Sequence, residues 1–156
     1  MKKTNAARIL DKINLSYQLK EFTVDKNDMS AENAAEQLGV PLSQVFKTLV
    51  TRGDKVGIIV ACIPGGSELD LKSLAKLSGN KKVEMVPVKE LPKLTGYEKG
   101  AVSPLGMKKN YPVYLDESAY KCSFILLSAG MHGVQLSLAP QDLVKALQAN
   151  TGKIAF

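Results

Sequence analysis

The stretch FKTLVTRGDKVGIIVACI, residues 46–63, contains two apolar runs separated by the polar segment RGDK. Apolar runs joined by a short segment with Gly53 and Asp54 at its tip are typical of a β-hairpin. The second run, VGIIVACI at 56–63, is far shorter than the roughly 20 residues that span a bilayer. We therefore predict a hairpin whose second arm is a buried strand.

Helices and further strands are predicted on both sides of this hairpin. Capped amphipathic helices are expected over residues 4–13, 30–39 and 68–79, and a last helix over 139–147. Strands are expected at residues 16–22, 82–88, 111–115, 122–130 and 133–138, with a helical turn or two at 89–96. Because strands outnumber helices and occur mostly as hairpins, we predict an α+β fold. Its mixed, strongly curved sheet should carry helices on the outside.

Length and composition limit the class of protein. A chain of 156 residues is long enough for one sizeable core, so residues 1–156 are interpreted as a single domain. The start, MKKTNAARIL, lacks the apolar segment of a secretory signal, so a cytoplasmic protein without membrane association is expected. Cys62 and Cys122 lie in apolar runs without a CxxC spacing, and the chain has one histidine. This excludes the familiar zinc motifs and favours two buried structural thiols.

Positive charge is concentrated in the middle third of the chain. The net charge of +6 results from 21 Lys and Arg residues against 15 Asp and Glu residues. Such an excess is compatible with a polyanionic partner such as RNA. From charge alone, solvated helix faces are the simpler explanation.

Two glycine-rich segments and one lysine are candidates for a functional site. GAVSPLG at 100–106 is either a stiff connection or a loop whose exposed backbone groups bind a substrate. SAGMHG at 128–133 is a second permissive turn, in which His132 is more typical of an exposed turn residue than of a general base. Lys47 begins an apolar strand, where its ammonium either reaches solvent or points into a cavity. No P-loop, GxGxxG, HExxH or GxSxG motif is present.

The order of these segments resembles the YbaK/EbsC family, the free-standing relatives of the editing domain inserted in bacterial prolyl-tRNA synthetases. The resemblance covers nearly the whole chain and rests on VFKTLV, ELDLKSLAKLSG, KKVEMV, TGYEKGAVSPLG, SAGMHGVQLSL and PQDLVKAL. Its most specific parts are the context of Lys47 and the GxxxP element from Gly100 to Pro104. The resemblance implies a mixed sheet curled toward a barrel, with helices around it.

The resemblance also implies an activity, the hydrolysis in trans of mischarged aminoacyl-tRNA, typically cysteinyl-tRNA(Pro). Lys47 matches the essential lysine of the family and Gly100 the glycine of its GxxxP loop, so both are predicted to be catalytic. In YbaK-type members the thiol of the substrate attacks its own ester carbonyl, so the protein supplies positioning and charge stabilisation. No cofactor and no metal are expected for this chemistry.

Further residues are assigned on the same basis. The predicted substrate-binding residues are Phe22, Ala101, Val102, Ser103, Pro104, Ser128, Gly130 and Gln135. From the basic middle third of the chain, the predicted tRNA-binding residues are Lys81, Lys82, Lys108 and Lys109. Association with prolyl-tRNA synthetase is compatible with this activity.

Two positions depart from the family pattern. Cysteine editors carry a tyrosine where this chain has Phe22 and an aspartate where it has Gln135. Both replacements remove a polar or acidic group from the expected pocket wall. Two alternatives therefore stay open beside a cysteine editor. One is the editing of another mischarged tRNA, such as Ala-tRNA(Pro), by an external water, and the other is a non-catalytic regulator that binds tRNA or a synthetase.

Overall fold

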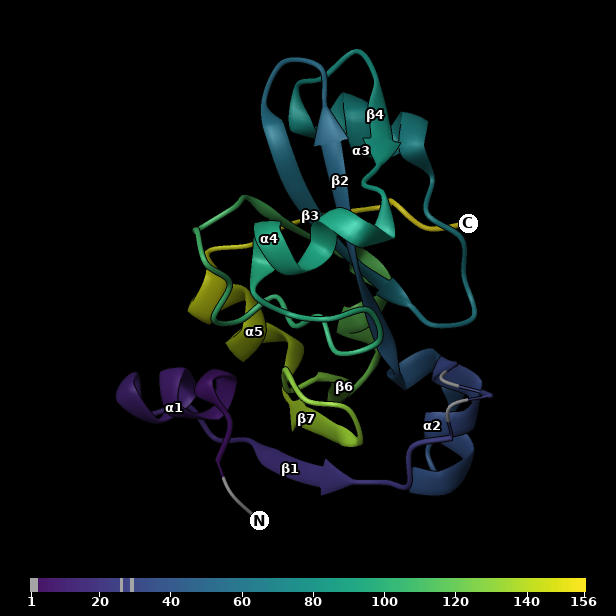
Figure 1. The fold of residues 1–156 in the computed structure, drawn as a ribbon, viewed down its shortest axis with the longest axis vertical. Coiled ribbons are helices and arrows are strands. Elements are labelled where there is room, and N and C mark those ends of the chain that lie inside the picture. The colour runs from purple at the N-terminus through teal and green to yellow at the C-terminus, as the bar shows by residue number, and fades with distance from the viewer. Residues whose placement is uncertain (1–2, 26, 29) are drawn as a thin grey trace.

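Residues 3–25, 27–28 and 30–156 are described by a computed structural model, which contains two β-sheets with helices around them (Figure 1). The three-stranded antiparallel sheet has the order β1-β7-β6, and the five-stranded mixed sheet has the order β4-β2-β3-β5-β8. The first sheet contains β1 Gln18–Glu21, β6 Ile125–Ser128 and β7 Val134–Leu138. The second contains β2 Phe46–Gly53, β3 Gly57–Pro64, β4 Val83–Met85, β5 Val113–Asp116 and β8 Asn150–Gly152.

The predicted α+β class and mixed sheet are confirmed, and the strands are divided between two sheets that do not close into a barrel. A parallel bridge between Val45 and Leu126 connects the start of β2 to β6. The three-stranded sheet therefore lies next to the open end of the β2–β3 hairpin, at the start of β2. This arrangement leaves space beside β2 between the two sheets.

The predicted hairpin is formed by β2 and β3, which pair from Phe46 opposite Pro64 to Gly53 opposite Gly57. Residues 59–63 of β3 are fully buried. Because successive side chains of a strand point to opposite faces, the two faces of β3 enter different cores. Val60 and Cys62 pack in the larger core, whereas Ile59 and Ile63 pack in the smaller one.

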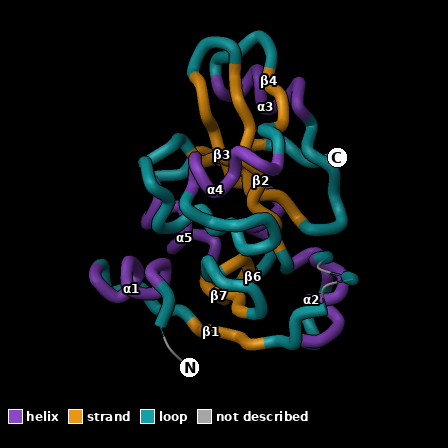
Figure 2. The backbone as a smooth tube through the Cα atoms, viewed as in Figure 1, coloured by secondary structure: helices purple, strands orange, loops and turns teal. Residues whose placement is uncertain are grey.

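Helices cover both faces of this central strand. Thr4, Ser30 and Asp70 each accept a hydrogen bond from the backbone N–H three residues later, which begins α1, α2 and α3. The helices span α1 Asn5–Lys12, α2 Ala31–Leu38, α3 Leu71–Ser78, α4 Leu91–Thr95 and α5 Pro140–Leu147. Helices α1 and α5 contribute to the larger core and α3 to the smaller one. Figure 2 shows the helices on the outside of the strands.

Several predicted elements are shorter than expected, and one was missed. The strand predicted at 82–88 covers only β4, because Pro87 precedes a 3₁₀ turn, Val88–Glu90. The strand predicted at 122–130 begins at Ile125, so Cys122 ends the 3₁₀ turn Glu117–Lys121 and is only partly buried. Strand β8 consists of polar and glycine residues without a strand pattern. No helix in the described part of the chain is long and apolar enough to cross a bilayer.

Shortening a buried side chain of β3 should destabilise the protein strongly. Ile59 is fully buried, so Ile59→Ala should lower the free energy of unfolding by about 2–5 kcal/mol, measured by urea denaturation. Val56, at the tip of the same hairpin, is 48% exposed, so Val56→Ala should change it by no more than about 0.5 kcal/mol. Equal losses in the two variants would contradict the central position of β3.

Candidate active site

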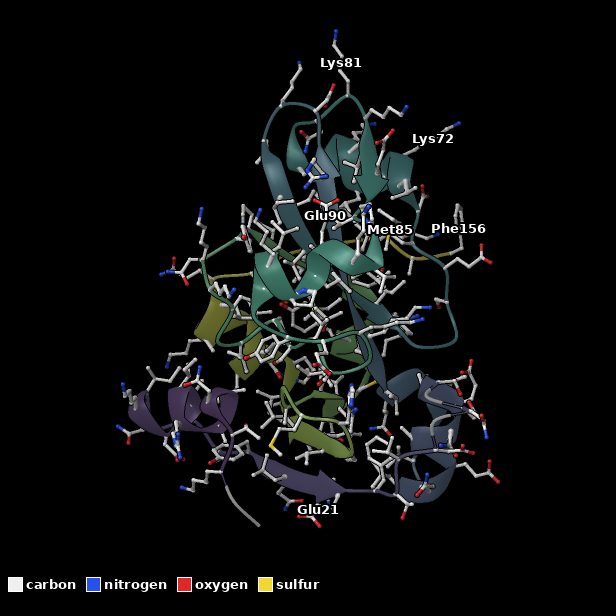
Figure 3. All side chains as sticks on the ribbon, in the orientation of Figure 1. Glu21, Lys72, Lys81, Met85, Glu90 and Phe156 are labelled. Atoms are coloured by element: carbon white, nitrogen blue, oxygen red, sulfur yellow. The ribbon has the colours of Figure 1, made fainter. Side chains whose placement is uncertain are left out.

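A cavity of about 310 Å³ is lined by residues from both sheets. One wall is the first half of β2 together with the start of α2. Another is the segment from the end of β4 to the start of α4, and a third comes from β6 and β7 of the three-stranded sheet. Lys99, Gly100 and Val102, at the beginning of the GAVSPLG loop, complete the wall. Figure 3 labels Met85 at the end of β4 and Glu90 before α4, and these two residues mark the wall formed between β4 and α4.

Many of the residues predicted from the sequence meet in this cavity. Those that line it are Phe22, Lys47, Gly100, Val102, Ser128 and Gln135. The predicted residues Ala101, Ser103, Pro104 and Gly130 do not line it. Ala101 and Ser103 are buried within their own loop, and Pro104 lines a different cavity of about 560 Å³ between α1 and α5. Gly100 and Val102 of the GxxxP element therefore line the candidate site, whereas Pro104 lies elsewhere in the protein.

Lys47 lies in β2 at the cavity and is half-buried. The ion pairs of the described residues join Lys3 to Asp11, Arg52 to Glu90 and Lys82 to Glu84, so none of them involves Lys47. A second lysine, Lys99, also lines the cavity. Sequence reasoning missed Lys99, although its position directly before Gly100 was a usable signal. The two lysines give the cavity a positive character that favours an anionic ligand.

The beginning of the GAVSPLG loop is held in one shape by local contacts. Gly100 has φ +84°, in the left-handed region that favours glycine. Ala101 N donates to Glu98 O over 2.9 Å, and Leu105 N donates to Ser103 Oγ over 3.2 Å. Since Gly100 itself is exposed, its backbone groups are accessible at the cavity.

Ser128 and Gln135 face the loop from the three-stranded sheet, where they are opposite each other on β6 and β7. Ser128 Oγ accepts a hydrogen bond from Gly130 N over 3.1 Å, which leaves its hydroxyl proton available to a ligand. Gln135 Oε1 is buried and has no hydrogen-bond partner. A buried acceptor without a partner is unfavourable, and a ligand that donates to it would remove that cost.

The cavity wall contains no aspartate, glutamate, histidine or cysteine among the described residues. A serine or threonine nucleophile requires an adjacent general base. The hydroxyl groups of this wall have none among the described residues. Cys62 is fully buried in β3, beside β2, and burial raises the pKa of its thiol to about 12, so it is no thiolate nucleophile. Within the described part of the chain, no group of three or more His, Cys, Asp or Glu residues could hold a metal ion. The arrangement offers hydrogen bonds and positive charge.

The four lysines predicted to bind tRNA are exposed, and none of them lines the cavity. The backbone N–H groups of Lys81 and Lys82 both donate to Asp54 Oδ1 at the hairpin tip. Figure 3 shows Lys81 at this end of the molecule, opposite Glu21 of β1. Lys108 and Lys109 follow the GAVSPLG loop, and Lys109 borders the 560 Å³ cavity. The four residues therefore form two separate pairs.

Comparison with known proteins places this site in a family. The family described as the aminoacyl-tRNA editing domain matches residues 25–146, most of the chain. The protein therefore belongs to the aminoacyl-tRNA editing domain family, as the YbaK/EbsC resemblance predicted.

Two relatives differ in how much of their length the similarity covers. The chain is 48% identical over 152 residues to EbsC of Enterococcus faecalis, covering 97% of this chain and 93% of EbsC. The name of that protein provisionally assigns it a Cys-tRNA(Pro)/Cys-tRNA(Cys) deacylase activity. The chain is also 35% identical over 100 residues to a proline–tRNA ligase of a Sulfurihydrogenibium species, covering 64% of this chain and 17% of the ligase.

Solved structures have the same fold. A crystal structure of a protein described only as hypothetical matches with a TM-score of 0.89 at 25% identity, covering 97% of this chain and 99% of the other. A second, titled provisionally as a trans-editing enzyme for prolyl-tRNA synthetase, matches with a TM-score of 0.83 at 23% identity. That match covers the whole of this chain and 99% of the other, and it supports the fold alone.

Proposed function

We propose that the protein acts as a single domain to deacylate mischarged tRNA in trans, with cysteinyl-tRNA(Pro) as its substrate. Family membership and the similarity to EbsC support the reaction class. The observation that carries the proposal is the composition of the cavity wall. It provides two lysines, backbone groups and an unpartnered acceptor, but no carboxylate, imidazole or thiol among the described residues.

Such a wall suits a substrate that brings its own nucleophile. The cysteinyl thiol attacks its ester carbonyl carbon, so a C–S bond forms while the C–O bond to the terminal ribose breaks. The thiol proton ends on the released ribose hydroxyl, and the amino acid leaves as a thiolactone. The protein then needs only to orient the ester and to stabilise the negative charge that develops on the carbonyl oxygen.

Lys47 is the residue proposed to stabilise that charge. Its side chain is half-buried at the cavity wall, and a charge interaction near a protein surface is stronger than in bulk solvent. It has no ion-pair partner among the described residues, so no internal contact must break before it binds. Backbone groups at Gly100 are proposed to orient the ester and the terminal ribose from the opposite wall.

Gln135 is proposed to bind the α-ammonium group of the aminoacyl moiety. Its buried Oε1 lacks a partner in the free protein, and an ammonium donates hydrogen bonds without accepting any. Phe22 and Val102 line the same cavity and would surround the side chain of the amino acid with apolar surface. Ser128, opposite Gln135, supplies a further hydroxyl.

The body of the tRNA is proposed to lie along the exposed lysines outside the cavity. Lys108 and Lys109 follow the loop that reaches the cavity, and the backbone of Lys81 and Lys82 is bonded to Asp54 at the tip of the hairpin. Lysines at such positions bind phosphates without reading sequence. Prolyl-tRNA synthetase is the proposed protein partner, because several relatives are proline–tRNA ligases in which a similar sequence is one part of a longer chain. We place this activity in the cytoplasm, where tRNA is charged.

The purified protein should release cysteine from Cys-tRNA(Pro) much faster than it releases alanine or serine from Ala-tRNA(Pro) or Ser-tRNA(Pro). Serine is the matched control, because it has the size of cysteine but a far weaker nucleophile. Loss of radiolabelled amino acid from each tRNA measures the three rates. Faster release of alanine would instead indicate attack by water, and failure on every mischarged tRNA with binding retained would indicate a regulator.

Replacing Lys47 should remove activity without unfolding the protein. Lys47→Ala should lower kcat for Cys-tRNA(Pro) by about 100-fold or more, the typical effect of losing one stabilising group at a developing oxyanion. Lys72, on α3 and outside the cavity, provides the control, and Lys72→Ala should keep wild-type kcat. Circular dichroism should show the same fold in both variants. Unchanged turnover by Lys47→Ala would remove this residue from the mechanism.

Replacing Gln135 should affect activity and stability in opposite directions. Gln135→Met replaces the unpartnered amide by an apolar group of similar length, so the free energy of unfolding should stay equal or rise. The same change should raise KM or lower kcat/KM at least about tenfold, because the ammonium loses its acceptor. Gln135→Glu keeps an acceptor and should retain activity. Full activity in Gln135→Met would contradict the proposed contact.

A further inference from the structure

The turn between β6 and β7, residues 129–133, is bonded to two parts of the cavity wall. Gly130 N donates to Ser128 Oγ over 3.1 Å at the end of β6. Phe22 N donates to Gly133 O over 2.9 Å, which connects the turn to the residue after β1. The turn is therefore fixed relative to the wall that the three-stranded sheet provides.

His132 extends from the same turn to the opposite wall. Its Nε2 lies 2.9 Å from the carbonyl oxygen of Lys99, the residue directly before Gly100. A carbonyl oxygen only accepts hydrogen bonds, so Nε2 is the donor in this contact. Among the described residues, this is the side-chain hydrogen bond that joins residues 128–133 to residues 97–106.

The carbonyl of Lys99 and the N–H of Gly100 belong to the same peptide group. This group is planar and trans, since no cis peptide bond is present in the described chain. The two bonds point in opposite directions, so a contact that fixes the carbonyl also fixes the direction of the Gly100 N–H. Because Gly100 has no side chain to limit rotation of the adjacent bonds, an external contact adds to the local ones in fixing this direction.

Apolar packing keeps the two segments together independently of His132. The ring of Tyr97 lies against the turn, and a Cβ added at Gly130 would be 2.8 Å from Tyr97 Cε1. Tyr97 also donates from its hydroxyl to Leu105 O, which closes the loop on itself. Loss of the histidine contact should therefore change the direction of one peptide group and leave the loop in place.

We propose that His132 is a positioning residue, which directs the Gly100 N–H toward the substrate by donating to the Lys99 carbonyl. The kinetic consequence rests on the proposed deacylase function, whereas the structural consequence does not. Gly100 N–H is then a fixed donor for the aminoacyl ester, and its misdirection affects the transition state more than the binding of tRNA.

Two variants of His132 separate this role from a general effect on the turn. The amide nitrogen of glutamine reaches about as far as Nε2, whereas that of asparagine corresponds to Nδ1 and is too short. His132→Asn should lower kcat for Cys-tRNA(Pro) by about 5-fold to 100-fold with little change in KM. His132→Gln should restore most of kcat. Met131, which is 51% exposed in the same turn, provides the control, and Met131→Ala should behave like the wild type.

Hydrogen exchange measured by NMR gives a readout that does not depend on activity. Ala101 N–H donates to Glu98 O next to the affected peptide group, so its exchange should be faster in His132→Asn and near wild type in His132→Gln. Wild-type kcat and wild-type exchange in His132→Asn would overturn the proposal. If the wild-type protein deacylates no tRNA, the proposed function fails, and the exchange rates alone decide whether His132 positions the loop.

Discussion

Strand β3 is apolar on both faces, and the rest of the fold depends on covering both of them. Val60 and Cys62 on one face and Ile59 and Ile63 on the other are completely buried. A sheet with one face in water would expose one of these rows, so a separate core packs on each face of β3. Strands β2 and β5 pair with its two edges. Leaving either face exposed would cost about 25 cal/mol for each Å² of apolar surface.

The site follows from the way β2 serves both the core and the cavity. Phe46 packs in the larger core and also borders the cavity, and the next residue, Lys47, lines the cavity as well. The same end of β2 is therefore both anchored in the core and exposed to the site. The bridge from Val45 to Leu126 then brings β6 alongside, and with it Ser128. A rigid hairpin, anchored in the core, thus holds the ammonium in place at the junction of the two sheets.

Local patterns in the sequence predicted the elements that depend on neighbouring residues. The hairpin, the caps at Thr4 and Ser30 and the place of Lys47 at the start of a strand were all predictable in this way. Strand β8 was not, because its residues have no strand pattern and pair only through β5. Similarly, Pro104 lines the other cavity, between α1 and α5, and this placement depends on tertiary structure that sequence spacing does not encode.

The polar groups at the cavity are prepared for a ligand at some cost to the free protein. Gln135 Oε1 is desolvated without a partner, and Lys47 is half-buried without a carboxylate beside it in the described structure. Neither arrangement stabilises the fold, since the buried acceptor loses hydration without gaining a hydrogen bond and the lysine forms no ion pair in the described structure. A bound substrate meets groups that are already in place, so no free energy is spent on reorganising them during the reaction. The barrier of the reaction is lower for that reason. The stability that offsets this cost comes from the apolar layers around β3.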